Sequence, residues 1–140
     1  MSDQVIAACM REFRAHSGDC SGFVKAVGAD VGVTIEGTAN DIVDTLRAGG
    51  DWVELADGPA ARASARAGKL VLAGLRGDEQ AVRNAHGHVV VVVDGPLDRN
   101  LYPSAYWGQL GGTGAECKTI NWAWTAQDRD RVTYGAHDLA

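Results

Sequence analysis

One cysteine of the sequence lies where its thiol could act as a nucleophile. Cys20 lies within residues 18–27, after polar and glycine residues and just ahead of an apolar pattern with helical spacing. The first turn of a helix has backbone N–H groups without intrahelical partners, and the helix dipole favours an anion there. A thiol in this position loses its proton more readily, and the thiolate is the reactive form. We therefore predict that Cys20 is a nucleophile at the start of a buried helix.

The second candidate for chemistry is a histidine further along the chain. His88 follows Gly87 and opens a run of five valines, residues 89–93, which is typical of a strand buried on both faces. Imidazole is the side chain that most often serves as general base. We expect Cys20 and His88 to meet. The alternative is a non-catalytic binding module, in which the cysteine is a small core residue and the histidine is a structural residue at a strand end.

Other reactive patterns are weaker. His86 and His88 would face the same side of a strand, but with Cys20 they match no usual zinc spacing and no CxxC is present, so we predict no metal site. The chain also lacks a dinucleotide-binding glycine motif in the required context, a P-loop and a Gly-x-Ser-x-Gly motif. Cys9 lies in a helical stripe and is expected to be a small core residue, and Cys117 follows a glycine-rich turn and is expected to have a structural or incidental role. With three cysteines, at least one is free, whether or not Cys9 and Cys117 pair.

Composition restricts the class of protein. A chain of 140 residues predicts one domain, residues 1–140. The net charge of −5 argues against a nucleic-acid partner, because the chain has no basic stripe for phosphates. The sequence contains no run of 18 apolar residues, so we expect no membrane insertion. The N-terminus lacks the basic region of a secretory signal peptide. We expect the protein in the cytoplasm of the producing cell, or exported without a cleavable signal.

Helical patterns come first in the chain and strand patterns follow. Apolar spacing predicts four helices, over residues 3–15, 19–31, 38–48 and 60–67. Strands are predicted over 70–75, 89–93, 120–124 and 132–134, with a short strand or turn at 52–55 and a loop at 76–87. The alternating charges of residues 128–131 indicate a solvated turn. This order favours an α+β fold with an antiparallel sheet.

Several short segments together resemble a known family. Residues 19–24, Asp-Cys-Ser-Gly-Phe-Val, are similar to the nucleophile motif of NlpC-type cell-wall cysteine peptidases, and residues 67–71 and 87–91 are similar to the strands around the histidine of that family. The resemblance is closer to the first family of type VI secretion amidase effectors and runs over nearly the whole chain. In shared order and spacing it also includes Ala39-Asn40, Gly95-Pro96-Leu97, Tyr102-Pro103 and Asp128-Arg129-Asp130-Arg131.

The resemblance implies a fold and an activity. The fold would be papain-like, with N-terminal helices packed on a central antiparallel sheet. The protein would be a toxin injected into a rival Gram-negative cell, where it would act in the periplasm on peptidoglycan stem peptides, between D-glutamate and meso-diaminopimelate. Its partners would be the secretion apparatus and a cognate immunity protein that occludes the cleft. Cys20 and His88 would be the catalytic pair, and no metal or cofactor is implied.

Two roles stay open at this point. The oxyanion would be held by the backbone N–H of Cys20 and by one further donor. Many NlpC-type enzymes orient the histidine with a polar third residue, often a second histidine, which is absent here; the candidates are Asn100, Ser104 or the carbonyl of Trp107. The same scaffold could also serve an autolysin or an acyltransferase that acts on another amide bond.

Overall fold

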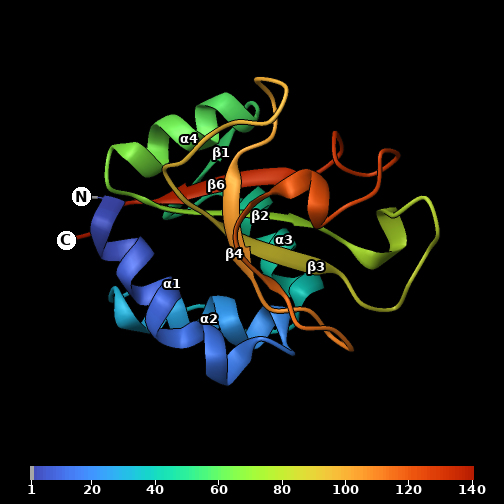
Figure 1. The fold of residues 1–140 in the computed structure, drawn as a ribbon, viewed down its shortest axis with the longest axis horizontal. Helices are drawn as coiled ribbons and strands as arrows, with labels where there is room; N and C mark the ends of the chain where they lie inside the picture. The colour runs from blue at the N-terminus through green and yellow to red at the C-terminus, as the bar shows by residue number, and fades with distance from the viewer. Residues whose placement is uncertain (1) are drawn as a thin grey trace.

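The computed structural model describes residues 2–140 and has an α+β architecture (Figure 1). Met1, the first residue of the predicted domain, lies outside the described residues. The helices are α1 (Ser2–His16), α2 (Cys20–Asp30), α3 (Ala39–Ala48) and α4 (Gly58–Arg66). The strands are β1 (Trp52–Leu55), β2 (Leu70–Leu75), β3 (His88–Val92), β4 (Ser104–Trp107), β5 (Ala115–Thr119) and β6 (Thr133–His137). Two short 3-10 turns, Gly77–Glu79 and Ile120–Trp122, follow β2 and β5.

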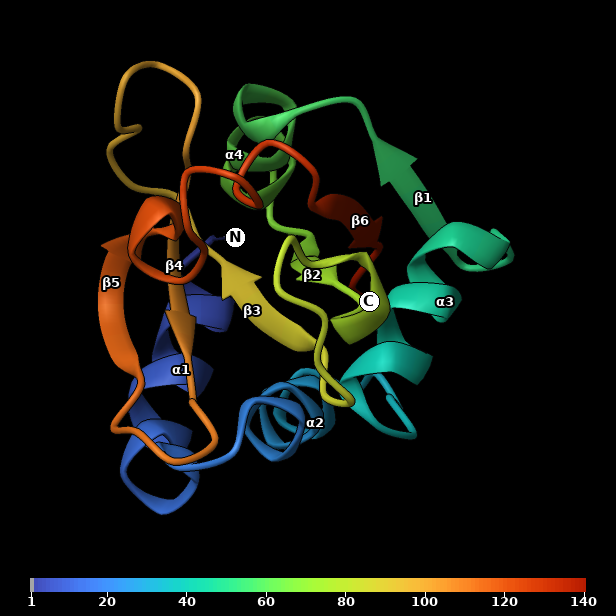
Figure 2. The ribbon, with the colours of Figure 1, turned by 90° about the vertical axis from the view of Figure 1, so that its right-hand side faces the viewer.

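The six strands form one antiparallel sheet in the order β1-β6-β2-β3-β4-β5. Helices α1, α2 and α3 pack on one face and α4 on the other, so that α2 and α4 lie on opposite sides of β3 (Figure 2). The valine run alternates between the two cores: Val89 and Val91 face α2, whereas Val90 and Val92 face α4. The predicted α+β fold, with N-terminal helices on a central antiparallel sheet, is confirmed.

Side-chain caps determine where the two helices nearest the site begin. The Asp19 carboxylate accepts a hydrogen bond from the Gly22 N–H (3.1 Å) at the start of α2. An ideal Cβ at Gly22 would lie 2.3 Å from Asp19 Oδ2, so this cap requires a glycine three residues later. Helix α3 begins with a capping box between Thr38 and Asp41. Both helix starts lie where the sequence predicted them.

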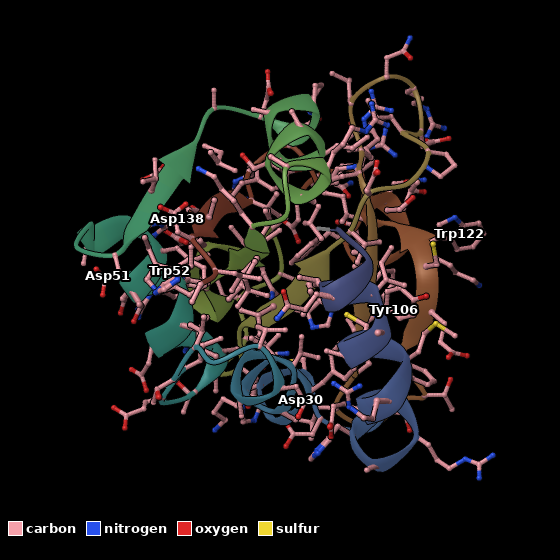
Figure 3. The ribbon with its side chains drawn as sticks, turned by 90° about the vertical axis from the view of Figure 1, so that its left-hand side faces the viewer. Asp30, Asp51, Trp52, Tyr106, Trp122 and Asp138 are labelled. Atoms are coloured by element: carbon pink, nitrogen blue, oxygen red, sulfur yellow. The ribbon has the colours of Figure 1, made fainter. Side chains whose placement is uncertain are left out.

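The prediction of a strand over residues 120–124 is wrong. The strand of this region is β5, which ends at Thr119, and a 3-10 turn follows. The turn exposes Trp122 at the surface (Figure 3), where its ring lies 5.1 Å from Lys118 Nζ. Trp124, after the turn, is buried. An alternating pattern of large apolar residues therefore arose from a tight turn. The unassigned segment around Tyr106 contains β4.

The two cysteines outside the candidate site differ in burial. Cys9 lies on the buried face of α1, as the helical stripe predicted, whereas Cys117 is exposed on β5; both are free thiols. No helix within residues 2–140 has both the length and the apolar character needed to span a bilayer.

Candidate active site

Cys20 is the first residue of α2, and it is buried against the strand that carries His88. Its thiol donates a hydrogen bond to the carbonyl of Gly87, with 4.0 Å between Sγ and the oxygen. The neighbouring Asp19 carboxylate is already engaged by Gly22 N–H and by the Ser21 hydroxyl (3.2 Å). The nucleophile candidate thus lies where the helix cap and the end of the 76–87 loop meet.

His88 is the first residue of β3, directly after Gly87. Its ring packs edge-on against two indoles, at centroid distances of 6.4 Å from Trp107 and 5.2 Å from Trp124. Neither ring nitrogen has a hydrogen-bond partner within residues 2–140. Aromatic packing, rather than a polar third residue, therefore sets the orientation of the imidazole.

Cys20 and His88 line the same cavity, which has a volume of about 250 Å³. A second cavity, of about 210 Å³, lies on the other side of the cysteine, next to the start of α3. The two cavities share Cys20, His86, Gly87 and Leu110, but only the larger one is lined by His88. The structure thus places both predicted residues in the wall of one cavity, and Cys20 also lines the second cavity.

Burial dominates the protonation of both groups. It raises the pKa of the Cys20 thiol, an effect that the nearby backbone N–H of Val89 opposes and the charge of Asp19 adds to. Burial lowers the pKa of His88 to about 4. The expectation that the helix start makes the thiol more acidic is therefore wrong for the free protein, because desolvation outweighs the helix terminus. Near neutral pH the pair rests as a neutral thiol and a neutral imidazole.

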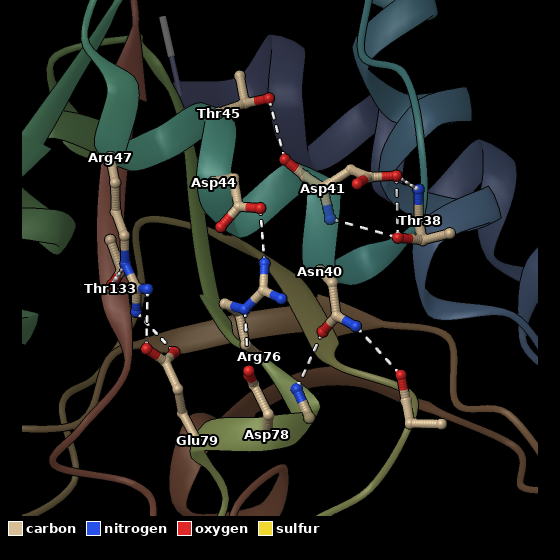
Figure 4. Close-up of polar contacts among 12 residues, drawn as sticks. Thr38, Asn40, Asp41, Asp44, Thr45, Arg47, Arg76, Asp78, Glu79 and Thr133 are labelled. Carbon is tan, nitrogen blue, oxygen red and sulfur yellow. Dashed lines mark hydrogen bonds and ion pairs between the residues drawn. The ribbon is translucent and has the colours of Figure 1, made fainter.

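Asn40 connects the loop before the histidine to helix α3. Its Oδ1 accepts from the Gly77 N–H (2.9 Å) and its Nδ2 donates to the Ala85 carbonyl (3.1 Å), so that one amide joins both ends of the loop (Figure 4). An ideal Cβ at Gly87 would lie 2.6 Å from Asn40 Oδ1. In the sequence, Ala39-Asn40 stood out only as part of a resemblance. A polar residue in the first turn of a helix does not by itself indicate hydrogen bonds to a loop almost forty residues later.

Ion pairs join the same loop to α3. Arg47 forms a bidentate pair with Glu79 (2.8 and 2.9 Å), and Arg76 contacts both Asp44 (2.6 Å) and Asp78 (3.0 Å) (Figure 4). Together with the Asn40 amide, these contacts fix the chain that enters β3.

None of the three groups considered as orienting groups for His88 forms a hydrogen bond with its ring. Asn100 lies exposed in the connection that leaves β3 at the end opposite His88. Ser104 donates to the Pro96 carbonyl (2.7 Å) and pairs with Val93, so it lies roughly 16 Å along the strand from the histidine. The Trp107 carbonyl faces Gly114, whose ideal Cβ would lie 2.1 Å from it, whereas the Trp107 ring contacts His88.

Asp128 was predicted to lie in a solvated turn, and this is wrong. Asp128 is only 6% exposed, and its Oδ1 accepts a hydrogen bond from the Ala81 N–H (2.8 Å). It lines the larger cavity together with His88. A local pattern of alternating charges could not reveal that the turn folds back on the 76–87 loop.

Metal ligands do not gather in the part of the chain that the structure describes. No group of three histidine, cysteine, aspartate or glutamate side chains is placed there to hold an ion. His86, which could have joined Cys20 and His88 in a metal site, lines both cavities.

The α+β fold, with a buried cysteine at a helix start and a histidine at a strand start in the wall of one cavity, is of the papain-like class. No family model matches the chain. The chain is 40% identical over 126 residues to the peptidoglycan amidase Tse1 of Pseudomonas aeruginosa, strain PAO1, over 87% of this chain and 77% of that protein. The chain belongs to the Tse1 family of amidases, which confirms the resemblance to type VI secretion amidase effectors.

Proposed function

We propose that this protein is a peptidoglycan amidase that uses Cys20 to hydrolyse the γ-D-glutamyl–meso-diaminopimelate bond of stem peptides. The observation that carries the proposal is the shared cavity of Cys20 and His88. Its support from outside the structure is the 40% identity to an amidase named for peptidoglycan. Residues 1–140 would form a single catalytic domain.

The mechanism begins from a neutral pair. His88, whose low pKa keeps it unprotonated above about pH 4, accepts the thiol proton as Cys20 Sγ attacks the γ-glutamyl carbonyl carbon. The carbon–sulfur bond forms, and the carbonyl oxygen becomes an oxyanion near the backbone N–H of Cys20. One such donor is typically worth about 10²–10³ in rate.

Collapse of the tetrahedral intermediate breaks the carbon–nitrogen bond. Protonated His88 gives its proton to the leaving amine of diaminopimelate, which leaves a thioester on Cys20. Neutral His88 then takes a proton from water as the water oxygen attacks the thioester carbon. The carbon–sulfur bond breaks, the D-glutamyl product leaves as a carboxylic acid, and His88 returns the proton to the Cys20 sulfur. The step needs no cofactor or metal.

The biological setting follows from the family and forms part of the proposal. The protein would pass through a secretion apparatus into the periplasm of a rival cell and act there as an antibacterial toxin. In the producing cell, a cognate immunity protein would bind over the cleft between the two cavities. The cleft residue Leu110 is 63% exposed, which would provide an apolar contact at its rim.

Digestion of purified peptidoglycan, followed by mass spectrometry of the fragments, tests the proposal. Wild-type protein should release fragments cut between D-glutamate and diaminopimelate, Cys20→Ala should release none, and His88→Ala almost none. Cys117→Ser, which removes an exposed thiol, is the matched control and should keep full activity. Full activity of both site variants would refute the assignment. Fragments cut at another bond would identify a different amidase, and capture of an added amine would identify an acyltransferase.

A further inference from the structure

One carboxylate faces the cavity in which the chemistry is proposed. Of the twelve residues that line the larger cavity, Asp128 is the only one with a carboxyl group; the others have apolar or neutral polar side chains or are histidines. No lysine or arginine lines this cavity. Its charge therefore suits a positively charged group on the ligand.

The two oxygens of Asp128 have different surroundings. Oδ1 accepts from the Ala81 N–H (2.8 Å) and lies 3.4 Å from Nη1 of Arg131, whose side chain is half exposed. Oδ2 has no hydrogen-bond partner within residues 2–140. This oxygen is not fully enclosed by protein atoms, so a donor group of a ligand can reach it, and a carboxylate oxygen can accept more than one hydrogen bond. One oxygen thus holds the 76–87 loop, and the other is available to a ligand.

The position of His88 determines which part of a substrate enters this cavity. The group that protonates the leaving amine must lie beside it, and His88 lines only the larger cavity. The leaving residue therefore occupies the larger cavity, and the acyl residue lies toward the smaller cavity, next to α3. Asp128 lies on the side of the leaving residue.

We propose that Asp128 binds, through Oδ2, the distal ammonium group of the leaving diaminopimelate. This inference rests on the proposed function, in which that residue is the leaving group. Diaminopimelate has a second amino group at the far end of its side chain, which is protonated at neutral pH. A hydrogen bond between ammonium and carboxylate would orient the scissile amide over Cys20 and select for the free amine.

The alternative is that Asp128 only ties two loops together. Asp128→Asn separates the two roles, because an asparagine oxygen can still accept from Ala81 N–H while the negative charge is lost. Asp130→Asn is the matched control: it removes the same charge two residues away, where the carboxylate accepts from the Tyr102 hydroxyl (2.7 Å) outside this cavity. Asp128→Ser, which keeps a short acceptor, replaces Asp128→Asn if the latter fails to fold.

The test compares two synthetic stem peptides, with the distal amine of diaminopimelate either free or acetylated. Wild-type protein should cut the free form with a kcat/KM higher on the order of tenfold or more, the effect of one hydrogen bond to a charged group. Asp128→Asn should lower the rate on the free form to that on the acetylated form, and Asp130→Asn should keep the wild-type ratio. A wild-type ratio near one, or an unchanged ratio in Asp128→Asn, would overturn the proposal.

Binding separates this proposal from the proposed function. If wild-type protein cuts neither peptide, the proposed reaction fails, and calorimetry on the Cys20→Ala variant decides about the subsite. Tighter binding of the free amine, abolished in the Cys20→Ala/Asp128→Asn double variant, supports the ammonium subsite. Equal binding of the two peptides, or no binding, overturns it.

Discussion

Asn40 Oδ1 occupies the space that a side chain at Gly87 would need: an ideal Cβ there would lie 2.6 Å from it and 2.9 Å from the Leu75 carbonyl. The Gly87 carbonyl also accepts a hydrogen bond from the Cys20 thiol, and Gly87 directly precedes His88. The contact between Asn40 and Gly87 therefore joins α3 to both members of the proposed catalytic pair.

Gly87→Ala should impair both folding and activity. The added methyl group must displace the Asn40 amide or the backbone of Leu75, which typically costs about 1–3 kcal/mol. The displaced strand start should also lower kcat. Urea unfolding and the peptidoglycan assay measure the two effects. Gly18→Ala is the control, because nothing lies within 4 Å of an ideal Cβ at Gly18; equal behaviour of both variants would show that the close approach has no consequence.

Asn40→Ala should lower kcat clearly and the free energy of unfolding only modestly. The change removes the bonds to Gly77 and Ala85, about 1–2 kcal/mol of stability in total, and releases the loop that leads into His88. We expect kcat to fall while KM changes little, since Asn40 positions the pair without reacting. Thr45→Ala is the control: it removes a hydrogen bond within the same helix, to the Asp41 carbonyl (3.1 Å), far from the loop. If Thr45→Ala reduces kcat as much, the effect belongs to helix stability and not to the hydrogen bonds of Asn40.

Acid should destabilise the protein through His88. Its pKa is lowered from 6.5 to about 4 in the folded protein, so between these pH values the unfolded chain binds a proton that the folded chain does not. The free energy of unfolding should therefore be highest above pH 6.5 and should fall as pH falls, by about 3 kcal/mol in total below pH 4.

Urea unfolding as a function of pH measures this dependence. His88→Gln should remove the part of the slope between pH 6.5 and 4 that His88 causes. The same slope in His88→Gln and in the wild type would show that other groups cause it.

Asp19→Asn should make the Cys20 thiol more acidic. The charge of Asp19 raises the pKa of Cys20, whereas asparagine is an equally good helix cap and keeps the acceptor for Gly22 N–H. Iodoacetamide should therefore alkylate Cys20 faster near neutral pH. The measurement uses a Cys117→Ser background, so that the exposed thiol does not contribute.

Asp30→Asn is the charge-matched control for this experiment. Asp30 is the last residue of α2, about 15 Å along the helix from Cys20. Its substitution should leave the alkylation rate unchanged. Equal acceleration by the two variants would mean that net charge, and not the local field of Asp19, controls the thiol.

Local chemistry determines much of the fold. A short polar side chain before an apolar pattern predicts a helix start because it caps the free N–H groups, and Asp19 and Thr38 do so. Five successive valines predict a strand with two covered faces, and the structure covers both. Such signals lie within one or two turns of the chain, so the sequence alone contains them.

The sequence misled where one local pattern fits two structures. Large apolar residues alternate over 120–124, which suits a strand, but the chain makes a 3-10 turn there and exposes Trp122. Alternating charges over 128–131 suit a solvated turn, but Asp128 is buried against the 76–87 loop. Neighbours along the chain could not distinguish these cases.

By itself, the sequence determined the class of fold, the helix that starts at Cys20 and the strand that starts at His88, because caps and apolar periods act over short distances along the chain. Only the tertiary structure decided how the site is built. The hydrogen bonds of Asn40 reach partners that lie 37 and 45 positions away in the sequence. The hydrogen bond between Ala81 and Asp128 joins residues that are 47 positions apart. The pKa of the thiol was likewise decided by burial, which depends on every element packed around Cys20 and which outweighs the effect of its helix terminus.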